Sequence, residues 1–291
     1  MSWVNAIVQG VLTGGLYALF ACGLSLMFGV MKVVNLAHGD LAVVAGYVAI
    51  GVITVTHVPV LWSVVIVVPI MAVLGYVLQR TIIQSALNRS VLTTLLVTFG
   101  LSVVIENGLQ QFFTANSRGI GVNLGLLTDS FNVGSQIRIA DLSVIILALA
   151  VAVLLGLQYF LTRSKYGRLI RAVADDQEAA QLSGADYRHV FGIAAALAFG
   201  TVALAGIADG MSSTLNPTAG TDTILLFAFA AVVIGGLGSL WGTLLGGIVL
   251  GVAQQLGSNI NISYETLAGY LVFLAVLVLR PEGLTTRRAR S

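Results

Sequence analysis

The sequence predicts an all-α fold, a polytopic transmembrane helical bundle that forms a single domain over residues 1–291. Of the 291 residues, 57% are hydrophobic and 9% are charged, whereas about 25% are charged in an ordinary soluble domain. Several long stretches lack Asp, Glu, Lys and Arg and reach the roughly 20 residues that a helix needs to cross a bilayer. The basic residues also gather in alternate loops. These observations exclude a soluble enzyme, a nucleic-acid-binding protein and a disordered chain.

Hydrophobic segments follow one another along the whole chain and predict about eight to ten spans. The first is longer than one crossing requires. We expect it to be a retained span, because no basic region precedes it as in a signal peptide. The second is short enough to enter and leave the membrane on one side. The segments are 5–30, 41–56, 60–79, 91–112, 142–162, 190–208, 223–237, 243–260 and 262–279.

The basic residues predict the orientation, with the N-terminus outside and the C-terminus cytoplasmic. In that orientation the inner segments are 31–40, 80–90, 163–189, the turn at 235–242 and 280–291, and they hold 12 of the 14 basic residues. Only Arg118 and Arg138 fall outside. This asymmetry follows the positive-inside rule. It places a cytoplasmic loop at about 163–189 and an extracytoplasmic loop at about 114–141.

Small residues spaced four apart predict close helix packing. Lipid supplies little hydrophobic drive for helix association, so close backbone contact at small residues must supply much of it. The stripes are Gly10, Gly14, Ala18 and Cys22; Gly192, Ala196 and Gly200; and the pairs Gly242/Gly246 and Gly247/Gly251.

One segment carries polar residues every fourth position: Thr94, Thr98, Ser102, Glu106 and Gln110. Such spacing places them on one slowly winding face of a helix. A carboxylate in mid-span costs about 2.5–3.5 kcal/mol on insertion scales, so it should face protein or a water-filled path. Two interpretations stay open: the stripe lines a translocation path, or it joins helices by hydrogen bonds.

The cytoplasmic loop is predicted to contain a short capped helix. Asp175 can cap its first turn with Glu178 as the reciprocal partner, and Gly184 suits the position that ends it. Ala179, Ala180 and Leu182 form an apolar side. A helix of this length is marginal alone, so it either docks in a partner's groove or belongs to a solvated connecting loop.

Motifs for chemistry are missing from the sequence. The glycine-rich stretch 235–242 lacks the lysine of a phosphate-binding loop, and the chain's lysines are Lys32 and Lys165. The histidines lie far apart, and the single cysteine, Cys22, excludes an internal disulfide. We therefore expect no enzyme activity, no catalytic residues, no metal, no cofactor and no ATP binding by this chain itself.

Four blocks of sequence resemble one family, the LivH-type permeases of branched-chain amino acid ABC importers. The stretch 23–40, GLSLMFGVMKVVNLAHGD, resembles their first-helix motif, with Asp40 where glutamate is common. Residues 167–184 resemble their ATPase-coupling loop. The turn 235–242 and the closing 280–284, RPEGL, also match, and the blocks keep the family order.

The resemblance implies a multi-pass subunit of a bacterial inner membrane importer for branched-chain or related amino acids. Its implied partners are a second, LivM-type permease subunit, two ABC ATPase subunits, an extracytoplasmic substrate-binding protein and membrane lipid, with no nucleic acid. The loop 114–141 is either a docking surface for the binding protein or an ordinary connector. The residues implied for ATPase coupling are Arg171, Asp175, Asp176, Glu178, Ala179, Ala180 and Gly184.

Translocation-path candidates lie in the first motif and the polar stripe: Asn35, His38, Asp40, Thr98, Ser102 and Glu106. We expect Asn35, His38 and Asp40 where the first two spans meet on the cytoplasmic side. They form either a gate or a helix break with caps. Asn216-Pro217 is expected to be a turn after the sixth span.

Two rival functions stay open at this stage. Permeases for urea and short amides resemble this family, so the same machine could import those substrates. An ion-coupled secondary carrier is the rival of another class. Such a carrier would require several intramembrane carboxylates at a central site, whereas Glu106 is the one clear candidate in this sequence.

Overall fold

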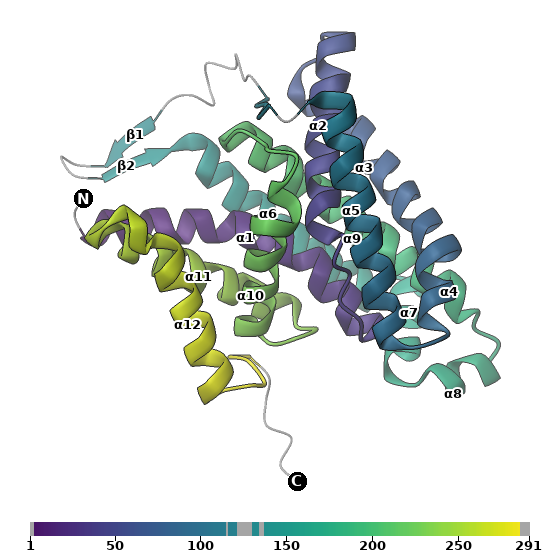
Figure 1. The fold of residues 1–291 in the computed structure, drawn as a ribbon. Coiled ribbons are helices and arrows are strands. Elements are labelled where there is room, and N and C mark those ends of the chain that lie inside the picture. Colours follow the sequence, from purple (N-terminus) through teal and green to yellow (C-terminus); the bar gives the residue numbers. More distant parts are fainter. Residues whose placement is uncertain (1–2, 115, 121–129, 134–136, 286–291) are drawn as a thin grey trace.

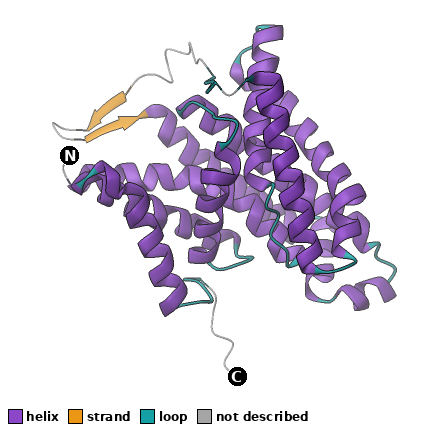
Figure 2. Cartoon of the chain, in the orientation of Figure 1, coloured by secondary structure: helices purple, strands orange, loops and turns teal. Residues whose placement is uncertain are grey.

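The computed structural model describes residues 3–114, 116–120, 130–133 and 137–285 and has the architecture of a helical bundle (Figures 1 and 2). Short π-helical turns, η1 (Gln79–Ile83) and η2 (Gly220–Ile224), and a 3₁₀ turn, η3 (Ile262–Tyr264), adjoin the helices. The α-helices of the described residues are α1 (Trp3–Met31), α2 (His38–Thr56), α3 (Val60–Leu78), α4 (Gln84–Leu87), α5 (Val91–Phe113), α6 (Asp141–Arg163), α7 (Lys165–Asp175), α8 (Gln177–Leu182), α9 (Tyr187–Ser212), α10 (Leu225–Gly235), α11 (Leu240–Ile260) and α12 (Glu265–Leu279).

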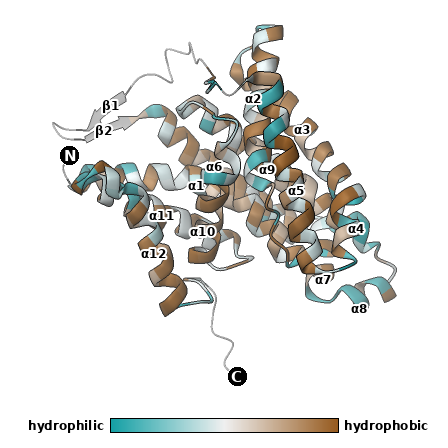
Figure 3. Ribbon diagram, in the orientation of Figure 1, coloured by the Kyte–Doolittle hydropathy of each residue, from teal (hydrophilic) through white to brown (hydrophobic). Residues whose placement is uncertain are grey.

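The predicted helical bundle is confirmed. Each hydrophobic segment of the sequence lies in a helix, and within the described part of the chain 8 helical stretches are long and apolar enough to span a membrane. A ninth apolar stretch, Gly220–Gly235, is shorter. Hydrophobic residues line the helices, whereas hydrophilic ones concentrate near α4 and α8 (Figure 3).

The loop 114–141 adds a small element that the sequence did not predict. Strands β1 (Ser130–Val133) and β2 (Ile137–Ala140) pair antiparallel, with Ser130 opposite Ala140. Before them, the backbone of Arg118 exchanges hydrogen bonds of 3.0 and 2.8 Å with that of Leu215. This pairing ties the loop to the segment that follows α9. Asp129 lies outside the described residues.

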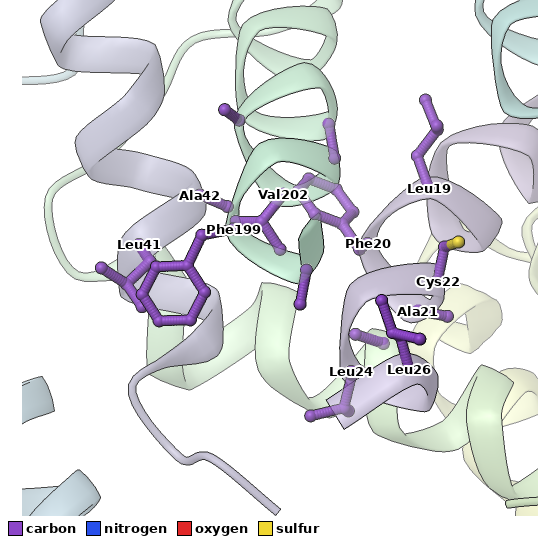
Figure 4. Packing of buried hydrophobic residues seen from close by; sticks show 14 of the residues in the cluster. Leu19, Phe20, Ala21, Cys22, Leu24, Leu26, Leu41, Ala42, Phe199 and Val202 are labelled. Carbon is purple, nitrogen blue, oxygen red and sulfur yellow. The ribbon is translucent and has the colours of Figure 1, made fainter. Parts of the chain in front are cut away.

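The core lies around α1 and α9. In each of these helices 72% of the most apolar window is buried, against 6% for the last span. Phe20 and Leu24 of α1 belong to the same buried cluster as Leu41 of α2 and Phe199 and Val202 of α9 (Figure 4). α1 and α9 are therefore central, while α3, α5, α6 and α12 present broad apolar faces outward.

Small residues allow the closest helix contacts, as predicted. A Cβ on Gly10 or Gly14 of α1 would collide with the backbone of α11 near Gly251 and Gly247. The other face of α11 meets α10, because a Cβ on Gly246 would collide with the backbone of α10. The two overlapping glycine pairs of α11 thus pack against two different helices, Gly247/Gly251 against α1 and Gly242/Gly246 against α10.

Candidate functional site

The loop 163–189, predicted to be cytoplasmic, folds into two short helices, α7 and α8, with a sharp break between them. Ser164 caps α7, because its Oγ accepts a hydrogen bond of 2.8 Å from the Gly167 amide. Asp176 is extended, with φ −148° and ψ 105°, and its Oδ1 accepts a hydrogen bond of 3.0 Å from the Ala179 amide. Asp176 is therefore the N-cap of α8.

The prediction that Asp175 caps this helix is wrong by one residue. Asp175 is instead the last residue of α7. Either of two adjacent aspartates can cap a helix, and the choice is set by where the preceding helix ends. The shift places Glu178 second rather than third in α8, so it does not take the reciprocal position of a capping box.

The end of α8 follows the prediction for Gly184. This glycine has φ +88°, a conformation that glycine adopts at little cost. The Gly184 amide donates to the Gln181 carbonyl at 2.9 Å, and the Ala185 amide donates to the Ala180 carbonyl at 3.0 Å. This pair of bonds is the Schellman motif, which fixes both the length of α8 and the direction of the chain after it.

The apolar residues of α8 divide between two faces. Ala180 is buried against the chain, whereas Leu182 is 92% exposed and Ala179 is exposed. The predicted single apolar side is therefore corrected: Ala180 anchors the helix, and Leu182 projects away from it. A cavity of about 440 Å³ lies beside Ala179 and Ala180, between α7, α8 and the start of α9, and Tyr166 and His189 also line it.

Arg171 lies on the exposed side of α7. Its guanidinium donates a hydrogen bond of 3.5 Å to the Thr162 carbonyl at the end of α6. It also lines a second cavity of about 330 Å³ with Ser25 of α1 and Trp241 of α11. Arg171 thus connects the loop 163–189 with the end of α1 and the start of α11.

Asp186 is a functional candidate that sequence reasoning missed. It caps α9 by accepting from the Arg188 and His189 amides, and it pairs with Arg80 of η1 at 3.4 Å. Slight desolvation would raise the pKa of the Asp186 carboxyl. The His189 and Arg188 amides and the Arg80 guanidinium outweigh it and hold that pKa below its ordinary value. An Asp a few residues before the apolar run that begins at Val190 was the available signal.

The second group of candidates surrounds the start of α2. Asn35 Oδ1 accepts a hydrogen bond of 3.0 Å from the Ala37 amide. His38 is fully buried, and its Nε2 lies 3.1 Å from the carbonyl oxygen of Phe20. Phe20 belongs to the middle of α1, so the structure places the start of α2 deep beside α1 rather than at the cytoplasmic ends of the two spans.

A chain of polar contacts joins three elements at this depth. Thr221 of η2 donates to Asp40 Oδ2 at 2.9 Å, and Thr221 Oγ1 lies 2.7 Å from Ser102 Oγ of α5. Nearby, the Leu36 amide donates to Thr98 Oγ1 at 3.2 Å. Asp40 and Thr98 are fully buried and Ser102 nearly so. We call the set Asp40, Thr221 and Ser102 the central junction.

The polar stripe of α5 therefore divides into two parts. Thr98 and Ser102 bond to other elements, as the interpretation of the stripe as an interhelical connection requires. Glu106 is half-buried and accepts a hydrogen bond of 3.1 Å from Gln110 of its own helix. Only the outer part of the stripe thus lies at the surface of this chain.

A family model described as the permease component of branched-chain amino acid transport systems matches residues 6–280. The chain belongs to this family. It is similar to the high-affinity branched-chain amino acid permease BraD of Pseudomonas aeruginosa and to LivH of Salmonella typhimurium. Each is 27% identical to it, with 98% of this chain and 96% of the relative covered.

The chain is also similar to a sugar permease. The ribose import permease RbsC of Escherichia coli is 28% identical over 90% of this chain and 81% of that protein. The solved structure of PsaBC from Streptococcus pneumoniae in complex with Fab has a TM-score of 0.49 and 13% identity, covering 97% of this chain and 93% of that one. That likeness is too weak to carry an argument. The permease is a multi-pass transport component rather than an enzyme.

Proposed function

We propose that this permease is a membrane subunit of an ABC importer that moves branched-chain amino acids, with ATP hydrolysed by separate ATPase subunits. The observation that carries the coupling proposal is α8, a helix capped at both ends whose Leu182 side chain is 92% exposed. A large apolar side chain held outward on a rigid, two-turn helix suits insertion into an apolar groove of another protein. The residues proposed for ATPase coupling are Arg171, Asp175, Asp176, Glu178, Ala179, Ala180 and Gly184. Ala180 is buried, so it serves the coupling by anchoring α8 rather than by touching the ATPase.

The mechanism assigned to the contact is rigid-body motion. Closure of the ATPase dimer would push on α8, and the α7–α8 unit would pass that motion to the helices it touches. Ile170 and Val173 of α7 are buried in the core, and Arg80 pairs with Asp186 directly after α8. These contacts connect α8 to α1, α9 and η1. The proposed importer also includes a LivM-type second permease subunit.

A soluble binding protein is proposed to deliver the substrate on the opposite side. The described part of the loop 114–141 includes the β1–β2 hairpin and the Arg118–Leu215 pairing. Leu215 precedes η2, which bears Thr221 of the central junction. A partner that presses on this loop would therefore act on a segment connected to the middle of the spans.

Uptake assays decide the function and the substrate together. We expect proteoliposomes with the complete transporter and its binding protein to take up labelled leucine only when ATP reaches the ATPase subunits. Urea and ribose are the competing substrates, and ribose is included because of the similarity to a ribose permease. ATP-dependent uptake of either without leucine would reassign the substrate. Uptake that follows an ion gradient and ignores ATP would contradict the importer proposal.

Glu106 provides the test of the translocation path. We propose that the path passes the outer part of the α5 stripe, because a half-buried carboxylate in a span needs water or protein beside it. Replacement by Gln keeps the shape and the bond with Gln110 but removes the charge, and should lower the maximal uptake rate several-fold with normal membrane insertion. Asn107→Ala on the exposed face of the same helix is the control, because it removes a neighbouring polar side chain without adding or removing a charge. Lower yield with unchanged specific uptake would instead assign Glu106 to bundle stability.

The other candidates for the translocation path remain predictions, and we propose for them a supporting role beside the path. Asn35, His38, Asp40, Thr98 and Ser102 are all buried within this chain. In the conformation described, substrate would reach them only after helices separate. Their hydrogen bonds favour a role in holding the helices beside the path.

A further inference from the structure

The turn before α2 has a counterpart 181 residues later, before η2, as the separation of Asp40 and Thr221 shows. Asn35 Oδ1 accepts from the amide two residues on, Ala37, at 3.0 Å, and Asn216 Oδ1 accepts from Thr218 at 3.1 Å. The carbonyl of each asparagine also accepts from the amide three residues on, at 3.2 and 3.0 Å. The same turn is thus built twice.

The helices around the two turns repeat in the same order. α1, α2 and α3 correspond to α9, η2 with α10, and α11. The helix before each turn packs against the last helix of the other unit, since α1 packs on α11 and α9 packs on α3. Left-handed residues precede both last helices, His57 with φ 53° and Gly238 with φ 82°.

The two units run in opposite directions. The end of α1, at Met31 and Lys32, borders the cavity lined by Val173 and Gln177 of the cytoplasmic loop. The end of α9 leads instead to Leu215, which pairs with Arg118 of the opposite loop. The two units therefore form an inverted repeat, as in many transporters whose sites lie where such repeats meet.

The two turns meet at their equivalent residues. Gly39 and Gly220 are in such close backbone contact that a Cβ on Gly39 would collide with the Gly220 carbonyl, and one on Gly220 with the Asp40 backbone. The next residue of each turn, Asp40 and Thr221, joins the units through the 2.9 Å hydrogen bond. Two helix starts, each with a positive dipole end, thus face one buried carboxylate.

We infer that the Asp40–Thr221 pair is the central clasp of this inverted repeat, and that its two members are positioning residues for transport rather than substrate ligands. The clasp holds the two helix starts together, so that the two units can tilt against each other without separating at their centre. Ser102 bonds the clasp to the middle of α5, which carries Glu106 one turn further on. The clasp therefore fixes α5 as well. This inference rests on the proposed transport function.

The pseudo-symmetry supplies a test, because the roles of the pair can be exchanged. In Asp40→Thr and in Thr221→Asp the two positions carry two hydroxyls or two carboxylates. The double exchange restores one carboxylate and one hydroxyl. We expect each single variant to lower the maximal leucine uptake rate at least tenfold in proteoliposomes with the complete transporter. The maximal uptake rate of the double exchange should return to within about threefold of that of the natural protein.

Two further readouts separate positioning from other roles. In Asp40→Ala, which removes the acceptor of the Thr221 hydroxyl, we expect an unchanged KM for leucine with fewer molecules transported per ATP hydrolysed, because the units lose their common centre while the substrate site stays. Asp222→Asn and Thr223→Val, exposed neighbours on η2, are matched controls and should transport normally. A raised KM in Asp40→Ala with unchanged maximal rate would overturn the inference in favour of substrate contact.

Thermal unfolding of the purified complex tests the clasp without transport. We expect each single variant to lower the Tm and the double exchange, Asp40→Thr with Thr221→Asp, to restore it. A double exchange that is as unstable and inactive as the single variants would overturn the inference. If the single variants do not fold, Asp40→Ala, Thr221→Val and their combination replace them. A combined loss smaller than the sum supports the pair, and additive losses contradict it. Failure of the natural protein to transport leucine would remove the proposed function but leave this measurement intact.

Discussion

At the residue scale, the difference between Asp175 and Asp176 yields a direct prediction. Asp176→Ala removes the side-chain acceptor of the Ala179 amide, and loss of an N-cap costs about 1 kcal/mol, which a helix of two turns cannot offset. We expect this variant to insert normally and to transport several-fold less leucine per ATP hydrolysed. Asp175→Ala at the exposed end of α7 removes the same charge from the proposed contact but no cap, so it is the matched control and should lose less coupling than Asp176→Ala. Equal losses in both variants would assign the effect to charge rather than to capping.

Single residues also mark the limit of what the sequence predicts. Gly184 was predicted correctly, because a glycine after an apolar run has one common use, the left-handed end of a helix. The cap was displaced by one position, because Asp175 and Asp176 have the same chemistry. Asn35 and Asp40 were recognised as candidates. The interpretation of Asn35 as a cap is confirmed by its bond with the Ala37 amide. The partner of Asp40, Thr221, lies 181 residues away, and hydropathy does not encode that contact.

At the element scale, helices were predictable where hydrophobic length decides them. The segments 91–112 and 142–162 correspond within a residue or two to α5 and α6. The stretch 223–237 was predicted as an ordinary span, whereas the helical stretch Gly220–Gly235 is short and starts beside Asp40. Mean hydropathy reports that a segment is buried in a membrane, but not the depth at which its helix begins. The hairpin β1–β2 was not predicted, because each of its strands is only four residues long.

The repeat itself was hidden for a related reason. The two turns read Asn-Leu-Ala-His-Gly-Asp and Asn-Pro-Thr-Ala-Gly-Thr and share only the asparagine and the glycine. Those two residues are what the geometry requires: an amide side chain that caps the turn and a residue without Cβ where the backbones touch. Sequence similarity elsewhere can disappear while the packing arrangement persists. Structure therefore reveals a relationship that residue identities do not.

At the scale of the whole molecule, the orientation in the membrane is the prediction on which the others depend. Val55 at the end of α2 is 80% exposed, and Ser85 on α4 is exposed. Ser85 lies near the far end of one continuous helical stretch, Val60–Leu87, which begins shortly after Val55. In a Cys22→Ala background, we expect Val55→Cys to react with a membrane-impermeant thiol reagent in intact spheroplasts. Ser85→Cys should react only after permeabilisation, because Arg80 and Arg89 keep that end inside.

Other labelling patterns of the two cysteine variants would contradict the predicted orientation in different ways. The reverse pattern would place α8 outside the cell, where no ATPase subunit could reach Leu182, and would contradict the coupling proposal as well as the orientation. Reaction of both positions from one side would contradict a single crossing by the stretch Val60–Leu87. In the expected pattern, α1 and α9 cross in opposite directions. The clasp between Asp40 and Thr221 then lies between a turn that enters from the cytoplasm and one that enters from outside, the arrangement that lets a single central contact respond to motion on either face of the membrane.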